Sequence, residues 1–100
     1  MQLETNVKPW CVYILLCADG TLYTGITNDI DRRVKAHSEG QGARYTRSRR
    51  PVDLVYQESA ESRSKATIRE AAIKRMSRKK KVEMIEDTAR SAAPSGPDIT

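Results

Sequence analysis

The stretch that decides the fold is Val12–Gly25, VYILLCADGTLYTG. It predicts two apolar strands around a tight turn at Ala18-Asp19-Gly20, because strand-forming residues flank an Asp-Gly pair. Each strand carries one tyrosine, Tyr13 or Tyr23, and Gly25 interrupts the second strand. The length of the turn therefore decides whether the two phenol rings share a face of the sheet.

Two turn lengths are compatible with these residues. A two-residue turn pairs Leu16 with Tyr23 and sends Tyr13 to the opposite face. A three-residue loop pairs Leu15 with Tyr23 and places both phenols on one face, two positions apart across the ladder. Asp followed by a left-handed Gly is a common ending for such a three-residue loop, so the sequence permits it.

Periodicity outward from the hairpin predicts the remaining elements. Alternating apolar residues in VDLVYQES favour a third strand, and helical spacing follows on both sides of it. We expect strands at about residues 10–17, 21–26 and 52–59, and helices at about 29–39, 61–76 and 78–86. The sequence therefore predicts an α/β fold of the α+β kind, with the order β-β-α-β-α-α. A small three-stranded antiparallel sheet would be flanked by helices.

The 100 residues leave room for one domain. We expect a flexible lead-in over residues 1–9, the domain over 10–86, a polar basic loop at 40–51 and a disordered tail over 87–100. No apolar run is long enough for a transmembrane helix and no secretory signal is visible, so we expect a cytoplasmic protein.

Cysteine usage fits a reducing compartment. Cys11 and Cys17 lie roughly 20 Å apart along an extended strand, which is too far for a disulfide. No Cys/His spacing is typical of zinc, and we expect two buried free thiols.

The charge of the chain favours a polyanionic partner. The net charge is +5 and the isoelectric point is about 9.5, which points first to nucleic acid. The segment ARYTRSRRP gathers four arginines without an acidic residue: Arg44, Arg47, Arg49 and Arg50. We expect this loop to contact phosphates, although a merely solvated basic loop is the alternative.

Three further side chains lie at the edges of apolar helix faces. Arg33 and His37 fall within about 40° of each other beside the apolar stripe of the first helix, whereas Arg32 points to solvent. Glu70 lies at the edge of a later helix, where an ion pair with Lys74 at i+4 is the ordinary interpretation.

Together these residues resemble the GIY-YIG nuclease superfamily, over about residues 10–86. The two motifs are Cys11-Val12-Tyr13 and Tyr23-Thr24-Gly25, followed by DRRVKAH. The resemblance is greatest to the small stand-alone bacterial members that lack an appended DNA-binding domain.

The resemblance implies a role for each matching residue in phosphodiester hydrolysis. Tyr23 would contact or deprotonate the attacking water, with Tyr13 positioning that water and the phosphate. Arg33 would hold the phosphate, and His37 matches a position taken by histidine or tyrosine. Gly25 is explained by a close backbone approach.

The metal follows from the same resemblance, and the partner from the resemblance together with the basic charge of the chain. Glu70 would bind one divalent ion, Mg²⁺ or Mn²⁺. Lys35 and the four arginines of the basic loop would bind DNA, and we expect a monomer. We therefore expect a metal-dependent DNA endonuclease whose hairpin has a three-residue or bulged turn, so that both tyrosines face Arg33 and Glu70.

Two other functions are compatible with these residues. A nucleic-acid-binding module with a weak or inactive site would keep the same fold. A binder of anionic membranes would need more large apolar residues than RKKKVEMIE supplies, so we expect no membrane partner.

Overall fold

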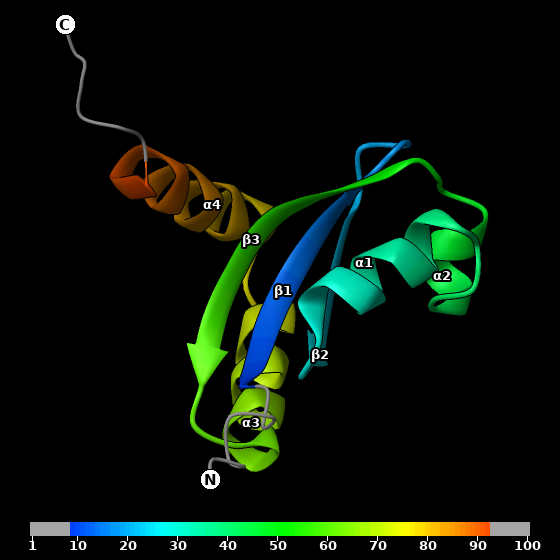
Figure 1. The fold of residues 1–100 in the computed structure, drawn as a ribbon. Helices are drawn as coiled ribbons and strands as arrows, with labels where there is room; N and C mark the ends of the chain where they lie inside the picture. The colour runs from blue at the N-terminus through cyan, green and yellow to red at the C-terminus, as the bar shows by residue number, and fades with distance from the viewer. Residues whose placement is uncertain (1–8, 93–100) are drawn as a thin grey trace, which may run out of the picture.

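The computed structural model describes residues 9–92, which form one sheet and four helices (Figure 1). The strands are β1 (Trp10–Cys17), β2 (Leu22–Thr27) and β3 (Val52–Ala60). The helices are α1 (Ile30–Ser38), α2 (Arg44–Arg47), α3 (Arg63–Lys74) and α4 (Arg78–Ala92). The sheet is antiparallel with the order β2-β1-β3. The predicted fold class and element order are confirmed, and the short helix α2 is an addition to them.

The hairpin uses a three-residue loop. Cys17 and Thr21 close it through a hydrogen bond from the Cys17 N–H to the Thr21 carbonyl at 2.9 Å. Gly20 within the loop has a φ of +85°, the left-handed conformation that glycine adopts without strain. The register pairs Leu15 with Tyr23. The expectation of a three-residue turn is therefore confirmed.

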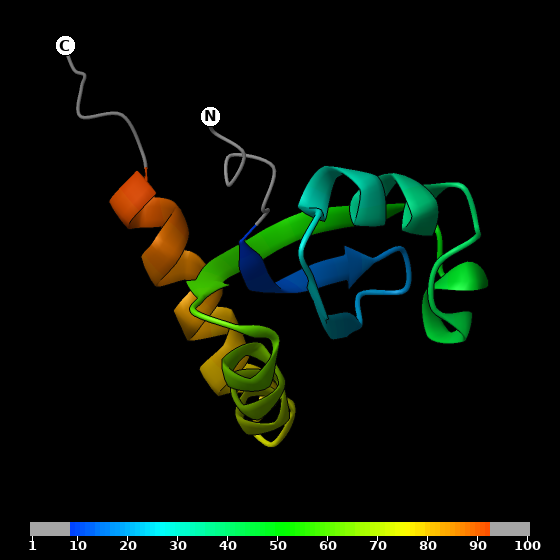
Figure 2. The ribbon, with the colours of Figure 1, turned by 60° about the horizontal axis from the view of Figure 1, so that its bottom comes forward.

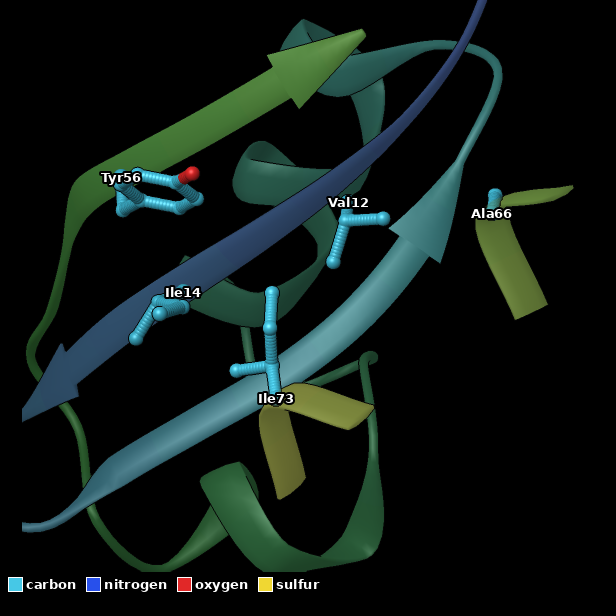
Figure 3. Close-up of a cluster of buried hydrophobic side chains, with 5 residues drawn as sticks. All are labelled: Val12, Ile14, Tyr56, Ala66 and Ile73. Atoms are coloured by element: carbon cyan, nitrogen blue, oxygen red, sulfur yellow. The ribbon is translucent and has the colours of Figure 1, made fainter. Parts of the chain in front are cut away.

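β1 is almost fully buried because helices cover both faces of the sheet. Figure 2 shows α1 over one face, and α3 and α4 under the other. Val12 and Ile14 point to the side of α3 and pack with Ala66 and Ile73 (Figure 3). Successive residues of a strand alternate between faces, so Tyr13 and its neighbours at i+2 and i+4 lie under α1. This explains why the strand is apolar without alternation.

Side-chain caps fix the starts of α1, α3 and α4, whereas α2 has no side-chain cap. The Asp29 carboxylate accepts a hydrogen bond from the backbone N–H of Arg32 at 3.3 Å, and Gly40 with a φ of +81° follows the end of α1. Ser62 and Ser77 accept equivalent bonds from the third residue after each of them.

Two boundaries differ from the predictions. The segment 40–51 is not entirely a loop, because it contains α2. The predicted end of the last helix at residue 86 is wrong, because α4 continues to Ala92. Asp87 and Arg90 form an ion pair one turn apart there, so local interactions extend a helix whose residues 87–91 remain exposed. The rest of the predicted tail, 93–100, and residues 1–8 of the lead-in lie outside the described residues.

Both cysteines are free thiols, as predicted. Cys17 is buried, whereas Cys11 is only half-buried. Among residues 9–92, no helix is long and apolar enough to cross a membrane.

Candidate active site

The two motif tyrosines lie on one face of the sheet, under α1. Their ring centroids are 6.4 Å apart. Tyr13 pairs with Gly25 across the hairpin, and a Cβ atom at Gly25 would lie 2.5 Å from the Tyr13 hydroxyl oxygen. The expected close approach at Gly25 is confirmed, and the group that approaches is the Tyr13 phenol.

Helix α1 brings Arg33 and His37 to Tyr13. The Nε–H of Arg33 donates to the Tyr13 hydroxyl oxygen at 3.3 Å, and Nε2 of His37 lies 3.0 Å from the same oxygen. Arg32 is exposed, whereas Arg33 is half-buried, and both line the same hollow at the surface. The predicted difference between the two arginines is therefore confirmed.

The buried imidazole of His37 connects Tyr13 to α2. Nδ1 of His37 lies 2.7 Å from the hydroxyl oxygen of Thr46, and that hydroxyl donates to the Ala43 carbonyl at 2.9 Å. Because a threonine hydroxyl has a single hydrogen, its donation to Ala43 assigns the proton of the imidazole to Nδ1, which then donates to Thr46. Nε2 is then the acceptor, and Tyr13 donates to it. The hydrogen bonds thus run in one direction from Arg33 to Ala43.

Burial and charge set the protonation states of the hydrogen-bonded residues His37 and Tyr13. Burial first, and then the positive charge of Arg33, lower the pKa of His37, so its imidazole is neutral near pH 7. Burial raises the pKa of Tyr13, and the negative charge of Glu70 adds to this rise. Tyr13 is therefore a neutral phenol with no exposed surface.

Tyr23 has different surroundings from Tyr13. It is half-buried and stacks on Tyr45 of α2 with ring centroids 5.9 Å apart and an interplanar angle of 27°. The hydrogen bond to Tyr13 is the largest cause that raises the pKa of Arg33, and Tyr23 contributes to the same rise. Both tyrosines therefore stabilise the positive charge of Arg33.

Glu70 reaches the neighbourhood of Tyr13 from α3. Its side chain is 21% exposed and forms an ion pair with Lys74 at 3.3 Å, which is the ordinary interpretation of the sequence. Its charge nevertheless contributes to the Tyr13 pKa, so both interactions coexist.

The donor set around Glu70 limits the metal that could bind there. Within residues 9–92, no three His, Cys, Asp or Glu side chains are grouped to hold an ion. A single half-buried carboxylate fits Mg²⁺ or Mn²⁺ that takes its other ligands from substrate oxygens and water. It does not fit an ion enclosed by protein ligands.

The predicted basic loop divides into two kinds of arginine. Arg44 and Arg47 are exposed, and within the described part of the chain their side chains make no ion pair or hydrogen bond. Arg49 instead pairs with Asp19 at 2.9 Å, and the Nε–H of Arg50 donates to the Arg47 carbonyl at 3.1 Å. Lys35 is exposed on α1. Only some of the predicted phosphate contacts are therefore free to move toward a ligand.

Tyr45 and Thr46 were not among the predicted site residues. The sequence signal was weak, because a one-turn helix has no periodicity and the surrounding arginines suggested a solvated loop. A Tyr-Thr pair in the run ARYTR was the available sign.

Comparison with known proteins agrees with this geometry. A family model described as the GIY-YIG catalytic domain matches residues 9–83. The chain belongs to the GIY-YIG family.

Similar proteins are small UPF0213 proteins of bacteria. The relative from Desulfotalea psychrophila is 56% identical over 84 residues, covering 83% of this chain and 76% of its own. The relative from Bacillus velezensis is 51% identical over 89 residues, covering 89% of this chain and 88% of its own.

Solved structures show the same fold. The solution NMR structure of a protein from E. faecalis has a TM-score of 0.58 at 37% identity, covering 92% of this chain and 98% of that one. The UPF0213 protein from Bacillus halodurans has a TM-score of 0.50 at 45% identity, covering 77% and 82%.

Proposed function

We propose that this protein is a divalent-metal-dependent endonuclease that hydrolyses phosphodiester bonds in DNA. The observation that carries the proposal is the contact of Arg33 with Tyr13, whose ring lies 6.4 Å from that of Tyr23 on the same face of the sheet. The Nε–H of Arg33 is bonded to Tyr13, which leaves the terminal amino groups of the guanidinium for Tyr23 and a phosphate. Arg33 is also accessible, since it lines a hollow at the surface with Thr27 and Arg32.

The two tyrosines have different proposed roles because their exposure differs. Tyr23 is half-buried and would contact the attacking water, either orienting it or accepting its proton. Tyr13 is 0% exposed, and its hydroxyl already accepts from Arg33 and donates to His37. We therefore assign Tyr13 to holding Arg33 in place, instead of the direct contact with water and phosphate that the family resemblance implied.

Glu70 would hold the divalent ion, Mg²⁺ or Mn²⁺, which when bound supplies charge compensation at the phosphate. Lys74 would release the carboxylate, and at 54% side-chain exposure it has room to do so. Arg44, Arg47 and Lys35 would contact the DNA backbone from the same side as α1 and α2.

The test is cleavage of labelled DNA and RNA substrates with Mg²⁺ or Mn²⁺. Glu70→Gln should abolish cleavage and leave nucleic-acid binding nearly unchanged, since the arginines supply the affinity. Arg33→Ala should lower both, because its charge contacts the phosphate in the bound and the transition state. Arg32→Ala and Glu83→Gln are matched controls on exposed positions of α1 and α4 and should behave like the wild type.

The alternative is a nucleic-acid-binding module without catalysis. Tight binding with no cleavage of any substrate would favour it. Cleavage that survives Glu70→Gln, or that Arg32→Ala reduces as much as Arg33→Ala, would refute the proposed assignment of residues.

A further inference from the structure

Two consecutive residues of helix α2 link it to the site tyrosines, to Tyr23 directly and to Tyr13 through His37. Tyr45 stacks on Tyr23, and Thr46 is bonded to His37, which is in turn bonded to Tyr13. Neighbouring residues of one short turn thus connect to the two tyrosines, one of them directly and the other through the His37 imidazole.

Thr46 determines the direction of the hydrogen bonds at Tyr13. With its hydroxyl hydrogen directed to the Ala43 carbonyl, its oxygen serves as the acceptor for Nδ1 of His37. Without that acceptor, the neutral imidazole could carry its proton on Nε2 and donate to Tyr13 instead. The Tyr13 oxygen would then receive two donors, from His37 and Arg33, and its own hydrogen would lose its partner.

The imidazole of His37 is packed too tightly to take another orientation. Thr46 and His37 are both 0% exposed. A Cβ atom at Gly42 would collide with Nδ1 of His37 and lie 2.6 Å from its Cγ atom. The imidazole is therefore confined between the α1–α2 connection and the Tyr13 hydroxyl.

The ring of Tyr45 contacts two other side chains. Tyr23 lies against one side, and the guanidinium carbon of Arg49 lies 4.0 Å from the ring centroid. Arg49 is held by the Asp19 carboxylate at 2.9 Å and by the Tyr45 carbonyl at 2.8 Å. The hairpin loop, through Asp19, thus fixes the side chain that supports Tyr23.

We propose that α2 is a positioning element of the active site, with Tyr45 and Thr46 as its positioning residues. Tyr45 holds the Tyr23 ring, and Thr46 holds the imidazole that directs Tyr13 and Arg33. The kinetic consequences rest on the proposed nuclease function, whereas the positioning itself does not. This role also reassigns Arg49, which supports Tyr45 and is not a phosphate contact.

The first experiment is spectroscopic and needs no enzymatic activity. His37 is the only histidine in the chain, so its signals need no further assignment. Its ¹⁵N and ¹H imidazole signals identify the neutral tautomer directly by NMR. The wild type should carry the proton on Nδ1, and Thr46→Ser should preserve this. Thr46→Val should lose it. Thr67→Val is the matched control, since the Thr67 hydroxyl bonds only its own helix at Arg63.

The wild-type spectrum decides even if Thr46→Val fails to fold. A wild-type proton on Nε2, or an unchanged tautomer in a folded Thr46→Val variant, would overturn the role of Thr46. The role of Tyr45 is tested by the NMR chemical shifts of the Tyr23 ring protons. These shifts should change in Tyr45→Ala and stay close to the wild-type values in Tyr45→Phe. Unmoved Tyr23 signals in Tyr45→Ala would overturn its role.

The second experiment separates positioning from substrate contact. Thr46→Val and Tyr45→Ala should lower kcat by about tenfold or more, as small displacements of reacting groups do, with KM within about twofold. Thr46→Ser and Tyr45→Phe should retain wild-type rates. A raised KM with unchanged kcat in Tyr45→Ala would make Tyr45 a substrate contact and overturn the proposal. If the wild type cleaves nothing, the nuclease function fails while the NMR results still decide the positioning role.

Discussion

Gly25 pairs with Tyr13 across β1 and β2, and the phenol of Tyr13 fills the space that a side chain at Gly25 would need. The glycine of the second motif is thus the steric counterpart of the tyrosine of the first. This relationship explains why a residue of low strand propensity occurs in the middle of a buried strand.

Gly25→Ala should therefore damage the site as well as the fold. Its Cβ atom would lie 2.7 Å from the Tyr13 ring carbon that bears the hydroxyl, and such overpacking typically costs about 1–3 kcal/mol. Cleavage should fall with it, because Tyr13 is displaced from Arg33. Gly20→Ala is the control: nothing lies within 4 Å of its added Cβ, but its φ of +85° is strained. It should cost about 1 kcal/mol and preserve cleavage. Urea denaturation and a cleavage assay measure both, and equal loss of activity in the two variants would contradict this account.

Removing the hydroxyl of Tyr13 should mainly lower stability, whereas removing that of Tyr23 should mainly lower the rate of cleavage. Tyr13→Phe leaves Nε2 of His37 and Nε of Arg33 without their partner, which should lower the free energy of unfolding by about 1–3 kcal/mol. Tyr23→Phe should change stability less, since Tyr23 is half-buried, but should lower the rate by about 10² or more if its hydroxyl acts on water. A Tyr23→Phe enzyme with a normal rate would exclude that role.

The fold should lose stability as the pH falls through the range in which histidine titrates. The pKa of His37 is lowered in the folded protein, by burial first and by Arg33 second. The unfolded chain, with a histidine pKa of about 6.5, thus binds the proton more readily. The contribution is fully present above that value and declines as the pH falls from it toward the lower folded pKa.

Because the chain has one histidine, this loss can be assigned to His37. The free energy of unfolding should decrease between about pH 7 and pH 5 in the wild type, measured by urea denaturation. His37→Gln should be less stable throughout and should lack this part of the pH dependence. An identical slope in both proteins would assign the effect to other groups.

Binding to DNA should depend on salt through Arg44 and Arg47. Each phosphate contact contributes a slope of about 0.9 to the fall of log affinity with log salt concentration. The double Arg44→Ala, Arg47→Ala variant should therefore reduce the slope by up to about twice that amount, alike for all sequences. Arg49→Ala is the comparison, and it should leave the slope nearly unchanged because Arg49 is paired with Asp19. An unchanged slope in the double variant would move the binding surface elsewhere.

The sequence predicted the structure best where a single local feature, such as a turn length or the rotation of a helix, fixes several contacts. The Asp-Gly pair left two registers for the hairpin, and the resemblance to GIY-YIG nucleases selected the one that places both tyrosines on one face. The higher exposure of Arg32 than of Arg33 could be predicted for a similar reason, since the apolar stripe fixes the helix rotation.

The contacts made by residues 43–50 could not be predicted in this way. Four residues of α2 show no periodicity, and the pairing of Arg49 with Asp19 joins positions 30 residues apart. The bond between His37 and Thr46 likewise depends on how the chain turns after Gly40. The end of α4 was misplaced because helix propensity and a local ion pair, rather than burial, sustain its last turn.

The central position of β1 has a consequence for how the site opens. The strand is paired with neighbours on both sides and covered on both faces. Amide hydrogens in such a strand exchange with solvent only when the whole domain unfolds, whereas short peripheral turns open at lower cost. Tyr13 therefore belongs to the part of the backbone that exchanges last, and α2 belongs to a part that exchanges early. Local opening of the site is expected to begin at α2 and to leave the first tyrosine in place.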